Sequence, residues 1–445
     1  MTSILLLAVA LGASYLAGRR SLVKGLAVVL TVGYAYGIVR ANRLDGYSHL
    51  LFDAALLGLY AARLFSPVSI ADRARTDDLR TWLIVLMGWP VLLFFVPRQD
   101  VLVELVGLRG NIFMLPCLVL GARLSRDEMY GLAGWLAVLN IAAAGAAAAQ
   151  FVFGIEPFFP RNPVTEIIYR SGDIAGFTAH RIPSSFTSAH AYAGTMVTSL
   201  PILVGAWMQP TRARWVHWMF GAAITVSVLA VFTTGARLPV VLLLVVATVA
   251  LFSGRVQIRY KLRWLAVAAM VAWAVSGQER LQRFLTLQDT DYVAERIAGS
   301  VDLDFMELAR TYPLGNGLGG GGTSIPYFLQ GRVRNSVAME NEYARIVLEQ
   351  GIPGLCAWVL FLAWVFTRSQ PAYPTWVLSR RLMRVGGAAA FASGMLGIGL
   401  LTSIPSTALL LLSAGWIAVA ERIPERAPAD RHARSPALEW QYGGR

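Results

Sequence analysis

Charged residues are scarce in this chain. Only 15% of its 445 residues are Asp, Glu, Lys or Arg, whereas about a quarter are charged in an average soluble protein. Hydrophobic residues make up 56%. This composition excludes an ordinary soluble protein and is typical of an integral membrane protein.

Cysteine is nearly absent as well. The two cysteines, Cys117 and Cys356, both lie within apolar segments. We interpret them as core residues rather than as a disulfide or a metal site. The sequence also lacks an internal repeat of fixed period and a second folded domain, and it predicts neither a metal nor a cofactor.

Apolar runs long enough to cross a bilayer, about 17–25 residues or slightly fewer, recur along almost the whole chain. They predict an all-α polytopic membrane protein with about 12 or 13 transmembrane helices, in which residues 1–420 form a single transmembrane domain. The first run is interpreted as a retained span, because "MTSILLL" lacks a basic start and Arg19 and Arg20 follow it. The candidate spans are 3–18, 22–39, 49–65, 82–97, 101–121, 131–153, 191–208, 216–233, 238–253, 264–276, 351–367, 385–402 and 404–420.

Basic residues fall in alternate loops. Every member of one set is basic, so the positive-inside rule makes that set cytoplasmic. The net charge of +13 therefore indicates membrane orientation rather than a nucleic-acid partner. The other set includes the two longest loops, 154–190 and 277–350, which we expect outside, and the polar tail 421–445 is predicted to be a disordered cytoplasmic end. The basic set contains Arg19, Arg20, Lys24, Arg73, Arg75, Arg80, Arg123, Arg126, Arg212, Arg214, the segment 254–263 and the segment 379–384.

Two arginines stand out on the expected outer side. The stretch "SGDIAGFTAHRIPSSFTSAHAYAGTM" places Arg181 in a polar loop before a span, with His180 and His190 close by, and "FTTGARLPVV" places Arg237 between two spans. Each arginine could simply reach the lipid headgroups. The alternative is phosphate binding, because a guanidinium presents a rigid fork of donors that suits phosphate oxygens and keeps its charge.

The long outer loop contains the glycine-rich run "RTYPLGNGLGGGGTSIPYF", which Arg310 begins and Arg332 and Arg334 follow. A nucleotide-binding P-loop is excluded, because no Lys-Ser or Lys-Thr pair follows the glycines. A turn or hinge is favoured over direct contact of its backbone amides with phosphate.

The stretch "VAMENEYARIVLEQGIPGL" at 337–355 predicts a charged helix at the entrance of a span. Glu342, Arg345 and Glu349 are spaced by three and four residues, so they can form a salt-bridged stripe worth a few tenths of a kcal/mol per pair. Glu340 stands near the helix start, where it could act as a cap or as a functional carboxylate.

The order of these motifs resembles the O-antigen ligase and O-antigen polymerase superfamily of membrane glycosyltransferases. By motif the resemblance covers roughly 180–370, and elsewhere only by hydropathy. It implies transfer of a glycan from undecaprenyl diphosphate to an acceptor hydroxyl, without a metal or a nucleotide. Arg181 and Arg237 would then stabilise the diphosphate leaving group, with Arg310 as a further diphosphate-binding residue.

The chain departs from the ligase branch at one position. The ligase branch has a histidine about three helical turns before the glycine at which the span begins. In this chain that glycine is Gly351, and Glu340 occupies the position of the histidine. This substitution favours a polymerase, in which another lipid-linked repeat unit is the acceptor, with Glu340 as the catalytic base and the loop 277–350 as a lid. The acceptor or lid residues would be Asn341, Glu342, Tyr343 and His190.

Other functions stay open. The chain could be a ligase that transfers the glycan to lipid A-core or another acceptor, a flippase or transporter of lipid-linked oligosaccharide, or a structural scaffold. No repeated halves with matching broken helices are present, which disfavours a carrier. The resemblance implies the bacterial cytoplasmic membrane, with the active site facing the exterior. The expected partners are undecaprenyl-diphosphate-linked oligosaccharide, a glycan or lipid acceptor and membrane lipids, and a chain-length regulator is a further candidate.

The topology can be tested with one introduced cysteine. In a background without Cys117 and Cys356, Ser324→Cys is expected to react with membrane-impermeant maleimide added outside intact cells, because basic loops stay inside. Labelling only after the reagent reaches the cytoplasm would reverse the predicted orientation and remove the outer-site assignment with it.

Overall fold

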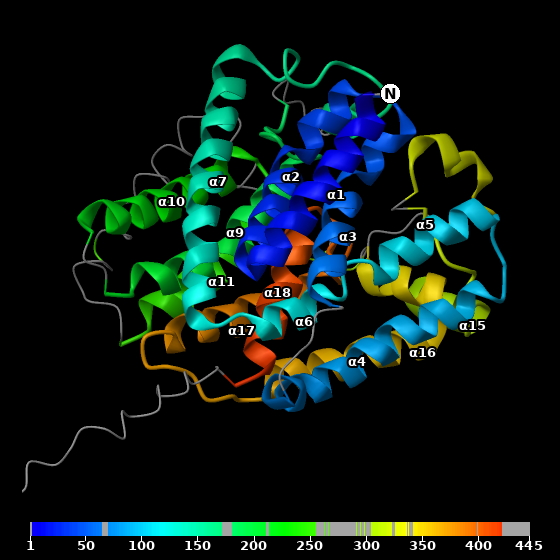
Figure 1. Cartoon of the computed structure of the whole chain (residues 1–445). Coiled ribbons are helices and arrows are strands. Elements are labelled where there is room, and N and C mark those ends of the chain that lie inside the picture. Colours follow the sequence, from blue (N-terminus) through cyan, green and yellow to red (C-terminus); the bar gives the residue numbers. More distant parts are fainter. Residues whose placement is uncertain are drawn as a thin grey trace, which may run out of the picture.

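The computed structural model describes residues 2–64, 70–170, 180–210, 213–254, 304–322, 325–335, 337, 341–397 and 399–420, and five single positions between 262 and 298. The chain folds into one helical bundle (Figure 1). Its helices are α1 (Thr2–Arg20), α2 (Leu22–Asn42), η1 (Gly46–Leu50), α3 (Leu51–Arg63), α4 (Ile70–Phe94), α5 (Val101–Ile112), α6 (Cys117–Arg123), α7 (Arg126–Phe153), α8 (Glu166–Arg170), α9 (Ala189–Trp207), α10 (Arg214–Thr233), α11 (Arg237–Leu251), α15 (Asp304–Thr311), η4 (Tyr327–Arg332), α16 (Glu342–Thr367), α17 (Val377–Ser393) and α18 (Ser406–Ala418).

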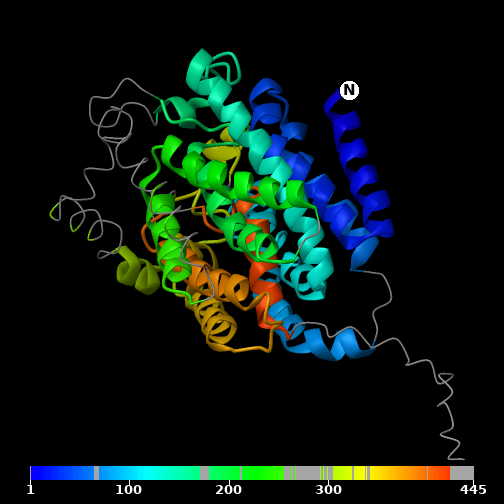
Figure 2. The ribbon, with the colours of Figure 1, turned by 90° about the vertical axis from the view of Figure 1, so that its left-hand side faces the viewer.

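The predicted fold class is confirmed: this is an all-α polytopic membrane protein, with no strand among the described residues. Within that part of the chain, six helices are long and apolar enough to cross a membrane, if Val101–Arg123, which contains α5 and α6, is counted as one, and α11 and α18 are shorter apolar helices. Of the six, α1 is the least buried and lies at the edge of the bundle (Figure 2). The number of crossings beyond these six stays a prediction. Glu340, the tail 421–445 and almost all of the expected span 264–276 lie outside the described residues.

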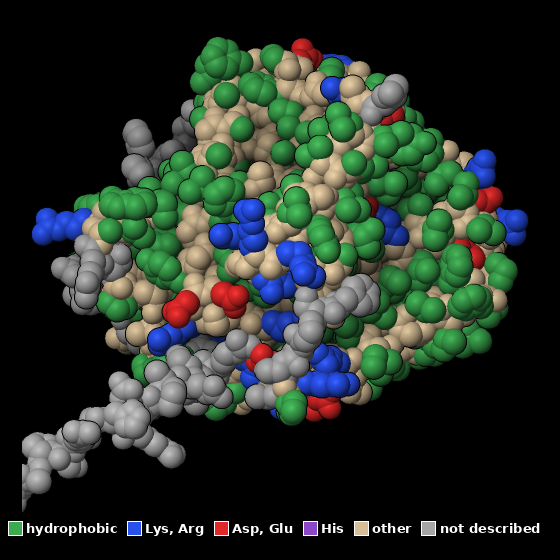
Figure 3. Space-filling model, viewed as in Figure 1, with side chains coloured by type: hydrophobic (Ala, Val, Ile, Leu, Met, Phe, Trp, Pro, Cys, Tyr) green, Lys and Arg blue, Asp and Glu red, His purple; other side chains and the backbone are tan. Residues whose placement is uncertain are grey.

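The loops separate into two groups at opposite ends of the bundle. At one end, which we call the basic end, Arg75 joins the ends of α18 and α6 by donating to the carbonyl oxygens of Ala420 and Ala122, each at 2.9 Å. Arg123 donates to Arg63 O at 2.7 Å. In Figure 3, Lys and Arg side chains gather in the lower centre of a face that is otherwise largely hydrophobic.

Helix ends explain these arginine contacts. The last carbonyl groups of a helix have no partner within the helix, and the negative end of its dipole favours a cation. Arg380, which is buried, donates to the carbonyl oxygens of Ile417 and Val419 at the end of α18, at 3.1 and 2.6 Å. Arginines of the basic end therefore close helix C-termini.

The opposite end, which we call the loop end, brings together the loops that were expected to share the outer side. Asn42 donates to Phe158 O at 3.0 Å, and Gln99 donates to Asn316 O at 2.9 Å. The separation of the two loop groups agrees with the alternation of basic loops in the sequence.

Several helix boundaries differ from the predicted spans. The run 101–121 is broken into α5 and α6 by a turn at 113–116, which ends at Pro116. Helix α4 begins at Ile70, so the charged segment expected to be a loop is helical there, and α17 begins at Val377 for the same reason. Charged residues lowered the hydropathy of these helix ends without stopping the helix.

Two glycines let α6 and α18 cross at close range. A Cβ added at Gly121 would clash with the carbonyl oxygen of Leu412, and one added at Gly415 would clash with that of Leu118. Small residues at such crossings allow the close backbone approach that drives helix association in membranes. This crossing fixes α18 against the centre of the bundle.

Gly121→Ala is expected to lower the thermal unfolding midpoint of the detergent-purified protein, because overpacking costs about 1–3 kcal/mol. The matched control is Gly134→Ala in α7, where an added Cβ meets nothing within 4 Å. This control should be neutral or slightly stabilising, since Ala is the better helix former. Equal midpoints for the two variants would contradict a tight crossing.

Candidate functional site

An irregular segment, residues 182–187, enters the bundle just before α9. Ile182 and Phe186 are buried in the main hydrophobic core. The hydroxyl of Ser184 donates to Ala143 O at 2.7 Å, and Gln150 donates to Ser184 O at 2.6 Å. Irregular backbone is tolerated inside a membrane protein only where protein groups satisfy its polar atoms. Helix α7 therefore supports this segment.

The inserted segment places Arg181 next to the start of α9. Ser188 caps that helix by accepting from Ala191 N at 3.2 Å. Nη1 of Arg181 lies 3.4 Å from Nε2 of His190, the second residue of α9. The sequence placed these two residues in one loop region, and the structure puts them in contact. His180 packs edge-on against the ring of Tyr169, with centroids 5.3 Å apart.

Arg237 begins α11 directly after a tight turn. Gly235 in this turn has φ of +66°, which favours glycine. A Cβ added at Gly235 would lie 4.0 Å from Cγ of Arg181, so the stem of Arg181 lies against the turn that leads into Arg237. One residue further on, Leu238 packs beside Gly397, where an added Cβ would be 3.5 Å from its Cδ2.

The start of α16 is fully provided with hydrogen-bond partners. Oδ1 of Asn341 accepts from the backbone N–H groups of Tyr343 and Ala344, at 2.8 and 3.2 Å. The N–H of Glu342 donates to Gly394 O at 2.8 Å. Asn341 is therefore the helix cap, and the hydroxyl of Tyr343 ties the helix to α17 by donating to Phe391 O at 2.9 Å.

The predicted stripe of Glu342, Arg345 and Glu349 forms, but inside the protein. All three side chains are at most 2% exposed. Arg345 lies 2.7 Å from Glu342 and 2.8 Å from Glu349. Because the stripe is buried, it is a structural core element and no exposed lid face, and removing one partner costs far more than the few tenths of a kcal/mol of a surface pair.

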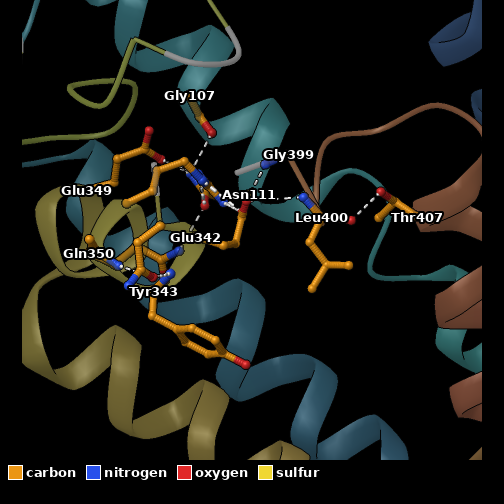
Figure 4. A network of polar contacts seen from close by, with 12 residues as sticks. Gly107, Asn111, Glu342, Tyr343, Glu349, Gln350, Gly399, Leu400 and Thr407 are labelled. Carbon is orange, nitrogen blue, oxygen red and sulfur yellow. Dashed lines mark hydrogen bonds and ion pairs between the residues drawn. The ribbon is translucent and has the colours of Figure 1, made fainter. Parts of the chain in front are cut away.

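Asn111 of α5 completes this network, and no local pattern in the sequence pointed to it. It donates to Glu349 at 2.7 Å and accepts from Gln350 at 2.9 Å. The other oxygen of Glu342 accepts from the N–H groups of Gly399 and Leu400, at 2.6 and 3.2 Å. Figure 4 shows these groups facing one another across α5, α16 and the segment before α18. The charged helix thus holds three separate parts of the chain together.

The glycine-rich run is a close-packed turn. Gly315, Gly317 and Gly319 have positive φ. A Cβ added at Gly315 would lie 2.7 Å from Glu349 O, and one at Gly107 would clash with the backbone at Gly319. Glycine is therefore required there for packing, in agreement with the turn that the sequence analysis favoured. Arg310 is exposed in the last turn of α15, and no described contact joins it to Arg181 or Arg237.

The structure therefore brings Arg181, His190 and the turn before Arg237 together. It connects them through Leu238 and Gly397 to the segment that Glu342 holds. The segment 394–405 was predicted as part of two spans, and its role was missed because its residues are apolar. No group of three or more possible metal ligands occurs among the described residues.

Comparison with known proteins does not identify a family. No family model and no curated protein matches the chain. The resemblance to O-antigen ligases and polymerases stays a prediction from the motifs. Function must therefore be argued from the geometry of the loop end.

Arg345→Met should destabilise the protein strongly, because it leaves two buried carboxylates without a cation, at a cost of about 3–5 kcal/mol. Thermal unfolding of the purified protein in detergent measures this loss. Arg310→Met, which alters an exposed arginine, is the matched control and should leave the midpoint nearly unchanged. The triple variant Glu342→Gln, Arg345→Met, Glu349→Gln should recover part of the loss. An unchanged midpoint for Arg345→Met alone would contradict the structural role.

Proposed function

We propose that this protein is a membrane glycosyltransferase that polymerises polysaccharide repeat units from undecaprenyl-diphosphate-linked oligosaccharide. The supporting observation is the position of Arg181, whose stem lies against the turn before Arg237 while its guanidinium contacts His190. Two arginines that stand at one turn of the backbone suit a diphosphate, because each can offer paired donors to its oxygens. The positive-inside rule assigns this loop end to the outer face of the cytoplasmic membrane.

Helix orientation adds to this interpretation. Helices α9, α11 and α16 all begin at the loop end, close to Arg181, Arg237 and Asn341. The N-terminus of a helix carries partial positive charge and favours anions. The helix ends and the arginines therefore act in the same direction on a diphosphate.

The proposed reaction is a displacement at the anomeric carbon of the donor sugar. The acceptor hydroxyl forms the new C–O bond, the bond to the diphosphate oxygen breaks, and the diphosphate leaves with the electron pair. Arg181 and Arg237 stabilise the charge that develops on it. The hydroxyl proton passes to a base, and Glu340 is the proposed base because Asn341 already caps α16.

Two alternatives use the same arginines. A ligase would transfer the glycan to lipid A-core or another acceptor, and a flippase would bind the diphosphate without chemistry. The substitution of glutamate for the ligase histidine favours polymerisation. Purified protein incubated with lipid-linked oligosaccharide separates the three: longer lipid-linked glycans support a polymerase, a conjugate formed only with an added acceptor supports a ligase, and movement across vesicles without product supports a flippase.

Arg181→Lys and Arg237→Lys are each expected to lower polymerisation by at least about 100-fold, because lysine keeps the charge but loses the bidentate fork. Product length and yield, measured by gel electrophoresis of the reaction, report this effect. Arg161→Lys is the control, since Arg161 is exposed at the same end and pairs with Glu156. Full activity of both Lys variants and of Arg181→Ala and Arg237→Ala would reduce these arginines to headgroup anchors.

A further inference from the structure

A second polar cluster lies at the loop end, built around His49 of η1. The rings of Phe328 and Tyr327, from η4, lie 5.9 and 6.5 Å from the His49 ring, and both aromatic residues are partly exposed. The hydroxyl of Tyr36 donates to His49 O at 2.9 Å. Segments far apart in the sequence, η1 and η4, thus meet at one imidazole.

Arg40, Arg109 and Asp45 are the charged residues that act on His49. Arg109 is paired with Asp53 at 2.6 Å, which offsets its charge. Arg40 lies over the ring of Tyr36, 5.9 Å from its centroid, and has no carboxylate within ion-pair distance among the described residues. Burial, Arg40 and Arg109 lower the pKa of His49 to about 4, against the smaller opposing effect of Asp45, so its imidazole is neutral at pH 7.

The imidazole is also available to a ligand. Its two ring nitrogens make no hydrogen bond to a described residue. A neutral imidazole offers one donor and one acceptor, which suits a sugar hydroxyl. The aromatic rings offer flat apolar faces on which the C–H face of a sugar ring can pack.

The cluster borders the same inserted segment as Arg181. Ile38 N donates to Ser185 O at 3.0 Å, and a Cβ added at Gly37 would clash with the backbone of Phe186. Arg40 lies three residues after Gly37, on the same face of α2 and one turn nearer the loop end. Both clusters therefore lie near the segment 182–187.

We propose that His49, Arg40, Tyr327 and Phe328 form a binding site for an acidic sugar unit of the acceptor glycan. This inference rests on the proposed function for its assignment to the acceptor. Arg40, which forms no ion pair with a described carboxylate, matches one carboxylate of a ligand, whereas a diphosphate carries at least two negative charges and suits the Arg181 and Arg237 pair. The imidazole would hold a hydroxyl of the same sugar, with the rings against its apolar face.

The test measures binding to the full-length protein in detergent by saturation-transfer NMR and calorimetry. The probes are a galacturonic acid oligosaccharide, its neutral galactose counterpart and undecaprenyl diphosphate. We expect Arg40→Gln to weaken binding of the acidic oligosaccharide about tenfold or more, since a charge-assisted contact is lost. Binding of undecaprenyl diphosphate by Arg40→Gln should not change. Arg181→Gln should instead weaken binding of undecaprenyl diphosphate and leave binding of the acidic oligosaccharide unchanged.

Arg43→Gln is the matched control, because Arg43 is an exposed arginine at the same end that donates to the Thr2 hydroxyl at 2.8 Å. His49→Gln and Phe328→Leu provide independent variants, each checked for an unchanged thermal unfolding midpoint.

Equal binding of the acidic and neutral oligosaccharides, or binding unaffected by Arg40→Gln, His49→Gln and Phe328→Leu, would overturn the proposal and leave the rings as interfacial anchors. Loss of undecaprenyl diphosphate binding in Arg40→Gln would overturn it too, by assigning the cluster to the donor. If wild-type protein binds the acidic oligosaccharide but no undecaprenyl diphosphate, the proposed function fails while the sugar site stands.

Discussion

Backbone polar groups inside a membrane protein must find partners within the protein, because the lipid offers none. Two irregular segments of this chain depend on that constraint. Residues 182–187 take their partners from α7, through the hydroxyl and carbonyl of Ser184. The backbone before α18 takes its partners from Glu342, whose carboxylate accepts from Gly399 and Leu400. Because both segments are held in this way, α9 and α18 begin at defined places at the loop end.

The same residue type serves different purposes at the two ends of the bundle. At the basic end, arginines such as Arg75 and Arg380 donate to carbonyl oxygens at helix C-termini, so part of their donor set is used by the fold. At the loop end, Arg40 lies over an aromatic ring, and that contact leaves its charge uncancelled. Helices run in both directions through the bundle: α18 ends at the basic end, whereas α2 ends at the loop end with Arg40 in its last turn. A cation is favoured at either C-terminus.

Hydropathy predicted the helical class and the separation of loops, because both depend on composition that is local in the sequence. The 3–4 spacing of Glu342, Arg345 and Glu349 likewise predicted their ion pairs. Burial of that stripe was not predictable in this way, because it depends on Asn111, which lies more than 230 residues earlier in the chain. Helix starts were predicted wrongly where charged residues were taken to indicate a loop, as at Ile70 of α4. The His49 cluster was not predicted either, because η1 and η4 are far apart in the sequence and meet only in the folded chain.

The buried charges of α16 bear on the candidate site through one shared segment. Glu342 binds the N–H groups of Gly399 and Leu400, while Gly397, two residues before, packs against Leu238, the neighbour of Arg237. A shift of Glu342 would therefore move both the start of α11 and the start of α16. Arg345 and Asn111 restrain such a shift, because between them they bind Glu342, Glu349 and Gln350 without exposing any of these groups. A charged helix at the entrance of a membrane span is thus explained by positioning: Glu342 holds the segment against which Leu238, the neighbour of Arg237, packs.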